Sequence, residues 1–347
     1  APVLVAKAML AERPAARAVV INSGQANACT GDEGMRNCRT TQELVAGALG
    51  LEASDVLPAS TGVIGAQLKM DLWEKAAPAL AANLGKATPE DFAKAIMTTD
   101  AFHKISHREV SLPGGVVRLV GMAKGAGMIC PNMATMLSVV LCDAQVEASV
   151  WQKMLRDAVD LTFNRVTVDG DTSTNDTLYG LANGASGVPA SGGEAIKALS
   201  AALTSVLGDL AYMLVKDGEG ASKVARIHVT GAASDADAER VARTVGHSQL
   251  VKTALYGRDA NWGRIVAAVG RSGADFNPDD VVVTLCGVEL FRKGQPTDLD
   301  FDALLEEPLK QRDLPIDIVL GSGSGSYTLL ASDLGHEYVN VNADYRS

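Results

Sequence analysis

The order in which strands and helices are expected along the chain constrains its fold more than any other feature. Apolar runs typical of strands mix with helical patterns, but the regular strand–helix–strand repeat of a doubly wound parallel sheet is absent. No period of 20–50 residues recurs, which argues against a repeat protein. The pattern therefore predicts an α+β fold. For 347 residues we expect two domains. The pattern of expected helices and strands changes near residue 233, so we place the domains at 1–232 and 233–347.

Local patterns place the individual elements. We expect strands at 17–22, 108–112, 116–122, 136–143 and 223–230. Helical periodicity covers 40–50, 70–84, 89–97, 145–162 and 194–216. After 233, two helical patterns precede strands at 280–290, 316–320, 326–332 and 337–342. The apolar run at 2–5 is typical of a strand inside a domain, so we expect leading residues to be absent.

The charge balance argues against several classes of partner. The net charge is −10, whereas nucleic acids and anionic membranes select a basic face. No apolar run approaches the roughly 18 residues that span a bilayer. The five cysteines are odd in number and form no CxxC motif, which argues against a disulfide framework and a zinc site and favours the cytoplasm. We therefore expect no nucleic-acid or membrane partner.

Common catalytic and cofactor motifs are missing as well. No GxSxG, HExxH or P-loop sequence occurs, and none of the five histidines stands in a nucleophile elbow. The glycine-rich residues 321–326 lack the GxGxxG spacing and precede a strand, so we interpret them as a hairpin or β-turn. We expect neither a metal nor a cofactor.

Residues 124–137 form the segment with the most informative chemistry. They include Lys124, two glycines, a Pro–Asn break and Thr135 at the start of an apolar run. A glycine loop between two strands is the structural interpretation. The functional alternative is self-processing, because cleavage between Ala134 and Thr135 would give Thr135 both a hydroxyl and a free α-amine. With a pKa of about 7.7–8.0, that amine could act as base for the hydroxyl without any histidine.

An acyl intermediate on Thr135 would also need donors for its oxyanion. Residues 60–65 offer two, because Gly62 exposes a backbone N–H without side-chain obstruction and Thr61 adds a hydroxyl. A plain turn is the alternative interpretation, because Ser-Thr-Gly is a common sequence.

Taken together, these segments resemble the ornithine acetyltransferase family, also called the ArgJ family. Residues 124–137 are similar to its self-cleavage segment. Further stretches resemble family signatures in the right order, at residues 22–31, 60–65, 163–176, 217–221, 261–264 and 342–347. Several long motifs over nearly the whole chain make the resemblance specific.

The resemblance implies a layered α/β/β/α sandwich with a smaller C-terminal α+β domain, and a self-processing enzyme. Cleavage after Ala134 would give an α chain of residues 1–134 and a β chain of residues 135–347. Thr135 would be the nucleophile, and Thr61 and Gly62 the oxyanion hole. The positions that match the family's substrate-binding residues are Lys124, Thr135, Glu219, Asn342 and Ser347.

The implied reaction moves the acetyl group of N-acetylornithine to Thr135 and then to glutamate. The two-reaction form of the family also takes acetyl groups from acetyl-CoA, whereas the one-reaction form does not. The resemblance also suggests that two α and two β chains assemble as α2β2.

Some residues depart from the family pattern. Ala101 stands where a substrate-contacting Thr is usual, Gln25 where Asn is usual, and Cys130 where Ala is usual. Cys130 has no histidine nearby in sequence, and we interpret it as a plain small side chain. Two alternatives stay open: a hydrolase of aminopeptidase or amidase type with the same nucleophile, and a small-molecule binder without activity. The acidic run 169–176 lacks EF-hand spacing and predicts a hydrogen-bonded turn near the active site.

Overall fold

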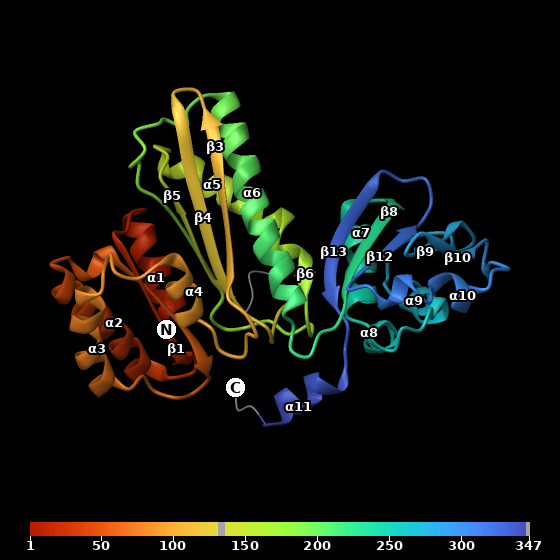
Figure 1. The fold of residues 1–347 in the computed structure, drawn as a ribbon, viewed down its shortest axis with the longest axis horizontal. Coiled ribbons are helices and arrows are strands. Elements are labelled where there is room, and N and C mark those ends of the chain that lie inside the picture. Colours follow the sequence, from red (N-terminus) through yellow and green to blue (C-terminus); the bar gives the residue numbers. More distant parts are fainter. Residues whose placement is uncertain (131–135, 345–347) are drawn as a thin grey trace.

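A computed structural model, which describes residues 1–130 and 136–344, contains two sheets that face each other and a third sheet beside them (Figure 1). The first sheet is the parallel pair β1 (Ala18–Gln25) and β2 (Val56–Val63). The second sheet has the strand order β3 (Lys104–Leu112), β4 (Gly115–Lys124), β5 (Leu137–Cys142) and β7 (Thr177–Ala182).

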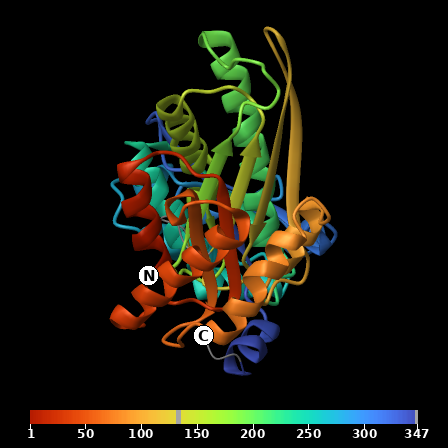
Figure 2. The same cartoon turned by 90° about the vertical axis from the view of Figure 1, so that its left-hand side faces the viewer.

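Burial of both faces of these two sheets produces four layers. Helices α2 (Gly31–Leu49) and α3 (Met70–Ala82) cover the outer face of β1 and β2. The inner face of that pair packs on the four-stranded sheet, where Leu57 of β2 joins Leu137 of β5 and Tyr179 of β7 in one cluster. Helices α5 (Ala148–Leu161) and α6 (Gly193–Lys216) cover the far side (Figure 2). The predicted α+β fold with α/β/β/α layers is confirmed.

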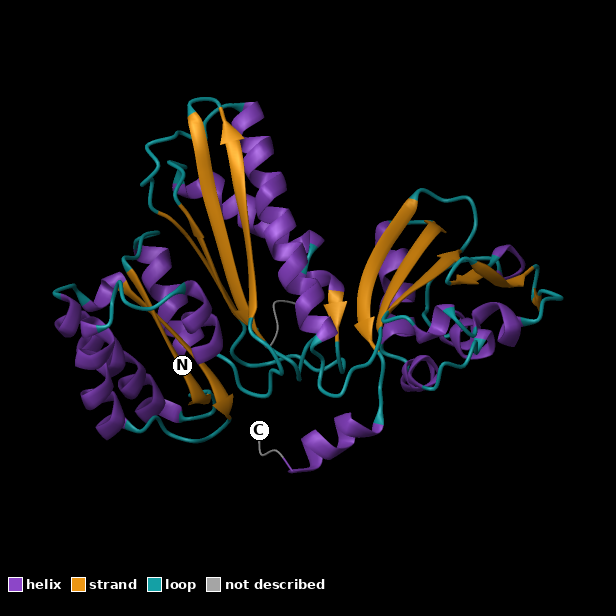
Figure 3. Cartoon of the chain, in the orientation of Figure 1, coloured by secondary structure: helices purple, strands orange, loops and turns teal. Residues whose placement is uncertain are grey.

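The third sheet supports the C-terminal part of the chain (Figure 3). Its strands lie in the order β11 (Gln295–Pro296), β10 (Val288–Arg292), β9 (Val282–Leu285), β12 (Asp313–Val319), β8 (Val224–Ala232), β13 (Gly325–Ser332) and β6 (Val166–Thr167). A second core cluster packs this sheet against the helices α7 (Asp235–Gly246), α8 (Gln249–Tyr256), α9 (Trp262–Gly270) and α10 (Phe301–Leu305).

Shorter elements complete the chain. Helix α1 (Pro2–Glu12) contacts β2 and α2, and α4 (Pro89–Ala95) contacts β3 and β4. Helix α11 (His336–Asp344) runs back from the third sheet toward the layered part (Figure 1). Single 3-10 turns occur at η1 (Ala53–Asp55), η2 (Phe163–Arg165), η3 (Pro278–Asp280) and η4 (Pro308–Lys310).

The third sheet begins before the predicted domain boundary at residue 233. Strand β8 pairs with β12 on one side and with β13 on the other. The division into 1–232 and 233–347 therefore places this strand apart from the sheet that it joins. The division into two domains itself stays a prediction.

Two segments expected as strands are helices. The run at 2–5 belongs to α1, which continues through Ala, Met and Leu residues that favour helix and begins with proline at its first position. The segment 337–342 lies in α11, none of whose side chains is buried. Val339 and Val341 alternate with asparagines and imitate a strand pattern, but no neighbouring strand pairs with them among the described residues.

Two turns also differ from expectation. The strand expected at 280–290 is a hairpin of β9 and β10, because Cys286 and Gly287 both adopt positive φ. The glycine-rich segment 321–326 joins no paired strands, since β12 and β13 lie on opposite sides of β8. It crosses the end of β8 instead, where the Gly323 N–H donates to the Gly231 carbonyl at 3.1 Å.

Helix α6 is apolar and long enough to span a bilayer by composition, with a mean hydropathy of 1.6, and no other helix in the described residues passes that test. In the fold it is a core helix. One side of it lies in the main hydrophobic cluster, with fully buried side chains at Leu199, Leu203, Val206, Leu207, Leu210, Leu214 and Val215.

Candidate active site

The ends of several strands and loops from distant parts of the chain enclose a polar cavity of about 80 Å³. It lies where β2 and β4 end and where α11 returns to the layered part. Its lining comes from seven segments of the chain, with Thr61, Gly62, Thr98, Lys124, Gly127, Ser173, Thr174, Asn175, Glu219 and Asn342 among the residues. The structure thus brings together all the predicted site residues that it describes.

The end of β2 depends on a close approach of two backbones. Gly62 lies opposite Gly24 in the parallel pairing of β1 and β2. It has φ +126°, and a Cβ there would lie 2.3 Å from the Gly24 carbonyl carbon. Only glycine fits this position without displacing β1. The adjoining Thr61 is buried at the cavity wall, so both predicted oxyanion-hole residues line the same cavity.

Lys124 ends β4 inside the cavity and is buried. Its Nζ donates to Thr98 Oγ1 at 2.6 Å and to Thr61 Oγ1 at 3.4 Å. Asp100 Oδ2 lies 3.8 Å from the same nitrogen. Burial lowers the pKa of Lys124, while the Asp100 carboxylate opposes that shift. The two groups that accept hydrogen bonds from the Lys124 ammonium are neutral hydroxyls. The ammonium can therefore also bind an anionic group of a substrate.

A second buried lysine fixes the loops around Lys124. Lys104 is fully buried, and its Nζ donates to Asp100 at 2.7 Å and to Asp217 at 2.5 Å. Asp100 also accepts from the Gly125 N–H at 2.6 Å, and Asp217 accepts from the Ala101 N–H at 3.1 Å. The loop after α4, the end of β4 and the loop after α6 are therefore held to one another.

The two carboxyls of this network are shifted in opposite directions. Burial alone would raise the pKa of Asp100, but Lys124 and Lys104 outweigh it and hold that pKa below the ordinary value. Burial raises the pKa of Asp217, with Lys104 opposing the shift. Asp100 is the carboxyl that lies within ion-pair distance of both lysines.

Glu219 and Asn342 meet at the mouth of the cavity. The Asn342 Nδ2 of α11 donates to Glu219 Oε2 at 2.7 Å. The Glu219 carboxylate passes directly over Gly127, where a Cβ would lie 2.4 Å from its oxygen. Glycine at 127 therefore leaves the room that Glu219 needs to reach the cavity.

The predicted nucleophile and cleavage site, Thr135 and Ala134, lie outside the described residues, as does Ser347. The segments that flank residues 131–135 are described, and the acidic run 169–176 contacts both of them. On one side, Asp169 accepts from the Met128 and Ile129 N–H groups at 2.5 and 3.0 Å. On the other side, the Met136 N–H donates to Asp176 Oδ1 at 2.8 Å.

Comparison with known proteins identifies the family. Residues 1–347, the whole chain, match the sequence profile of the ArgJ family. An arginine biosynthesis bifunctional protein ArgJ from Nitratidesulfovibrio vulgaris is 73% identical over 347 residues, which cover all of this chain and 88% of that protein. This chain belongs to the ArgJ family. It is accordingly an enzyme of arginine biosynthesis, with the acyltransferase activity of that family.

Two further ArgJ proteins agree with this assignment. The one from Geobacter sulfurreducens is 48% identical over 333 residues, covering 95% of this chain and 85% of its own length. The crystal structure of arginine biosynthesis bifunctional protein ArgJ from Bacillus halodurans matches with a TM-score of 0.56 and 36% identity, covering 58% of this chain and 96% of the solved chain.

In this ArgJ chain the fold brings a histidine to Cys130. The Cys130 Sγ lies 3.4 Å from His247 Nε2, although the two residues are far apart in sequence. Burial raises the pKa of the Cys130 thiol and lowers the pKa of His247. Both shifts favour neutral groups, whereas a nucleophilic cysteine needs a lowered pKa. The pair therefore carries none of the charge separation that would activate the sulfur.

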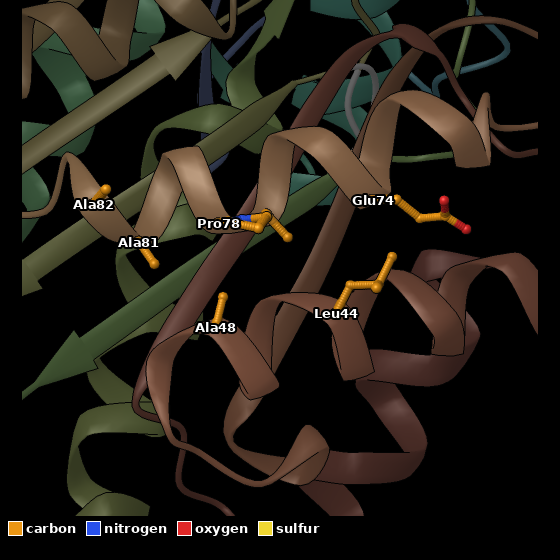
Figure 4. Close-up of a pocket in the computed structure, with 7 residues that line it drawn as sticks. Leu44, Ala48, Glu74, Pro78, Ala81 and Ala82 are labelled. Atoms are coloured by element: carbon orange, nitrogen blue, oxygen red, sulfur yellow. The ribbon is translucent and has the colours of Figure 1, made fainter.

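A larger hollow in the ArgJ chain lies between α2 and α3 and encloses about 510 Å³ (Figure 4). Its walls are apolar, from residues such as Leu44, Ala48 and Pro78, and Glu74 is the one ionisable group among its lining residues. A reaction that moves an acyl group needs a nucleophile and convergent donors, and this hollow offers neither. The smaller polar cavity is therefore the candidate active site.

The buried network around Lys104 was missed by sequence reasoning. Asp217 stands in a stretch that resembles the family and Asp100 precedes Ala101, which departs from the family pattern, but nothing in either place indicates a shared lysine. The spacing of four residues between Asp100 and Lys104 was the available signal, and it is common on any surface. Among residues 1–130 and 136–344, no group of three His, Cys, Asp or Glu side chains could hold a metal ion.

Proposed function

We propose that this ArgJ chain is a glutamate N-acetyltransferase that moves the acetyl group of N2-acetyl-L-ornithine to L-glutamate through an acetyl ester on Thr135. In this proposal the bond between Ala134 and Thr135 is first cut, which gives chains 1–134 and 135–347. The word bifunctional in the relatives' names supports acetyl-CoA as a second acetyl donor.

The observation that carries this proposal is the composition of the polar cavity. Lys124 can pair with a substrate carboxylate, and Glu219 can hold a substrate ammonium. Thr61 and Gly62 line the same cavity, which supports their proposed role as oxyanion donors. N2-acetylornithine carries a carboxylate, an amide and a side-chain ammonium, and ornithine adds a second ammonium at its α-carbon, so the charges of the cavity suit both.

The proposed reaction balances without a cofactor. The Thr135 hydroxyl attacks the acetyl carbonyl carbon and gives its proton to the Thr135 α-amine. The C–N bond of acetylornithine then breaks, the ester forms, and the proton passes to the leaving ornithine amine. In the second half, the glutamate amine attacks the ester carbon, and the Thr135 oxygen regains a proton.

Mass spectrometry of the full-length protein incubated with N-acetylornithine tests the proposal directly. We expect a fragment that begins at Thr135 and is heavier by one acetyl group. The Thr135→Ala variant removes the hydroxyl that would attack both the peptide and the substrate, and we expect it to remain a single unacetylated chain. An intact wild-type chain that transfers acetyl groups would contradict the proposal.

Adding glutamate distinguishes the transferase from the hydrolase alternative. Acetyl groups should leave the enzyme as N-acetylglutamate in an amount equal to the ornithine released. Release of free acetate instead would favour the hydrolase, and neither product would favour the binder. We also propose a cytoplasmic location and an α2β2 assembly, which cell fractionation and light scattering of the purified protein can check.

A further inference from the structure

Asp100 is a fully buried carboxyl beside the polar cavity, and the proposed reaction gives it no part. Two backbone groups donate to it, the Thr98 N–H to Oδ2 at 3.0 Å and the Gly125 N–H to Oδ1 at 2.6 Å. Two ammonium groups also face it. Lys104 Nζ donates to Oδ1 at 2.7 Å, and Lys124 Nζ lies 3.8 Å from Oδ2. A buried carboxylate with this many positive and polar partners can stay ionised.

The backbone contacts of Asp100 fix the position of the Lys124 ammonium. Gly125 follows Lys124 at the end of β4, so its bond to Asp100 holds the backbone from which the lysine side chain extends. The Thr98 hydroxyl accepts from Lys124 Nζ at 2.6 Å, while the Thr98 N–H donates to the same carboxylate. The lysine is therefore oriented at both its ends before a substrate binds.

Charged groups from several parts of the chain face Lys124. Burial lowers the pKa of this lysine, and among the charges that act on it Asp100 raises the pKa most. The Lys104 cation lowers it, and Glu219 and Asp176 raise it by less. Burial raises the pKa of Asp176 to about 8, so at pH 7 this carboxyl adds little negative charge. The charge of Lys124 therefore depends mainly on Asp100.

The second carboxyl of the network differs from Asp100 in both charge and place. Burial would raise the pKa of Asp100, but Lys124 and Lys104 hold it below the ordinary value. Burial raises the pKa of Asp217. Asp217 forms an ion pair with Lys104 at 2.5 Å, and within the described ranges it forms none with Lys124. The two aspartates share one lysine, but only Asp100 pairs with the second.

We propose that Asp100 is a positioning residue that keeps the Lys124 ammonium charged and oriented, and thereby sets the upper pH limit at which the substrate carboxylate binds. The proposal rests on the proposed function, in which Lys124 pairs with the carboxylate of N-acetylornithine. Lys104 acts in the opposite sense, because its cation shares the Asp100 carboxylate with Lys124 and repels the Lys124 charge.

The sign of the expected pH effect follows from these charges. A neutral Lys124 cannot pair with a carboxylate, so kcat/KM for N-acetylornithine should fall as the pH rises through the pKa of Lys124. Removing the Asp100 charge lowers that pKa and should move the fall to lower pH by about 1 pH unit or more. Removing the Lys104 charge raises that pKa and should move the fall to higher pH.

The test measures kcat/KM for N-acetylornithine with full-length protein from about pH 6 to about pH 10.5, the ordinary pKa of lysine. Asp100→Asn removes the charge but keeps an oxygen for Lys104 and the Gly125 N–H. Asp100→Glu keeps the charge and should retain the wild-type pH of the fall. Asp217→Asn is the matched control, because it removes the other carboxyl that contacts Lys104 and leaves the Lys124 pair in place. The substrate ammonium titrates alike in all variants, so differences between them report the enzyme.

A second readout does not depend on activity. Acetic anhydride reacts only with neutral amines, so labelling at graded pH followed by mass spectrometry reports the pKa of Lys124. The midpoint of Lys124 labelling should fall in Asp100→Asn and stay unchanged in Asp217→Asn. Lys94, which is exposed on α4, is the internal reference.

Each result has a defined meaning. A folded Asp100→Asn variant whose kcat/KM falls at the wild-type pH overturns the role of Asp100. So does an equal shift in Asp217→Asn, because the loss of any carboxyl from the network would then suffice. Should Asp100→Asn be insoluble, Lys104→Met decides: a fall at higher pH supports the role, and an unchanged pH overturns it. A wild-type chain that transfers no acetyl group contradicts the proposed function instead, and the labelling of Lys124 still decides whether Asp100 maintains its charge.

Discussion

At the scale of single residues, the site is built on positions that tolerate little change. Gly62 permits two backbones to meet, and Gly127 leaves room for a carboxylate. Lys104 is a counter-ion for two buried aspartates, Asp100 and Asp217. Each of these three residues decides where a neighbouring group lies, and Lys104 does so from outside the residues that line the cavity.

Gly62→Ala should destabilise the protein by roughly 2–4 kcal/mol, because its Cβ would lie 2.3 Å from Gly24 at a φ that L side chains rarely adopt. Urea denaturation measures the loss. Gly47→Ala in α2 is the control, since no atom lies within 4 Å of its added Cβ. Alanine there should stabilise by about 0.5–1 kcal/mol, because glycine is the poorer helix former. Equal effects of the two substitutions would contradict this reasoning.

Lys104→Met should cost about 3–5 kcal/mol, because it leaves Asp100 and Asp217 buried without their shared cation. The same denaturation experiment measures it. Lys94→Met removes an exposed ion pair with Glu90 and should change stability much less, because solvent screens this pair. If Lys104→Met lowers the free energy of unfolding no more than Lys94→Met does, the buried network does not hold the loops together.

At the scale of elements, the site depends on strand ends and on one exposed helix. The ends of β2 and β4 and the start of β7 converge because the two sheets pack face to face. Helix α11 buries none of its side chains, so it adds little to the core. Its place near the cavity depends on specific contacts, such as the close approach of Glu337 and Tyr338 to Gly220.

Asn342→Ala should weaken substrate binding more than stability. The lost hydrogen bond frees Glu219, and we expect KM to rise about 10-fold, equivalent to about 1.4 kcal/mol. The melting temperature should stay almost unchanged, because no core contact is lost. Asn340→Ala is the control, since Asn340 is also exposed on α11 and donates a hydrogen bond to Glu337 of the same helix. Equal KM values for the two variants would show that Asn342 does not contribute to substrate binding.

At the scale of the whole molecule, the proposed cleavage would divide a single folded unit. Strand β4 would fall in the first chain and β5 in the second, although the two pair antiparallel from Leu119 to Lys124. The layer of β1 and β2 would likewise pack on strands of the other chain. A cut between them removes one covalent bond but none of these contacts.

We therefore expect chains 1–134 and 135–347 to remain associated after cleavage. Size-exclusion chromatography should show one complex in native buffer, and two chains should separate only in denaturant. The physical reason is the apolar area buried between the layers, whose exposure opposes dissociation. Separation of the chains in native buffer would contradict the layered packing.

The sequence predicted most of the local structure. The strand at Ala18–Gln25 and the helices at Met70–Ala82 and Gly193–Lys216 were indicated by apolar periodicity, and Thr88 with Pro89 marked the start of α4. Errors arose where the pattern was ambiguous. In α11, two valines alternate with asparagines and imitate a strand, and in α1 a short apolar run has no periodicity of its own.

Within the site, the sequence by itself determined the family, the chemistry of Lys124 and Glu219, and the order of the motifs, because these depend on residue type and spacing. Only the tertiary structure decided that Lys104 joins Asp100 to Asp217 and that Asp176 stands beside Met136. Both arrangements depend on which strands pair and in which register, and strand pairing between distant segments leaves no local trace in residue spacing. Burial, which sets the charge state of these carboxyls, is likewise a property of the packed layers rather than of any segment alone.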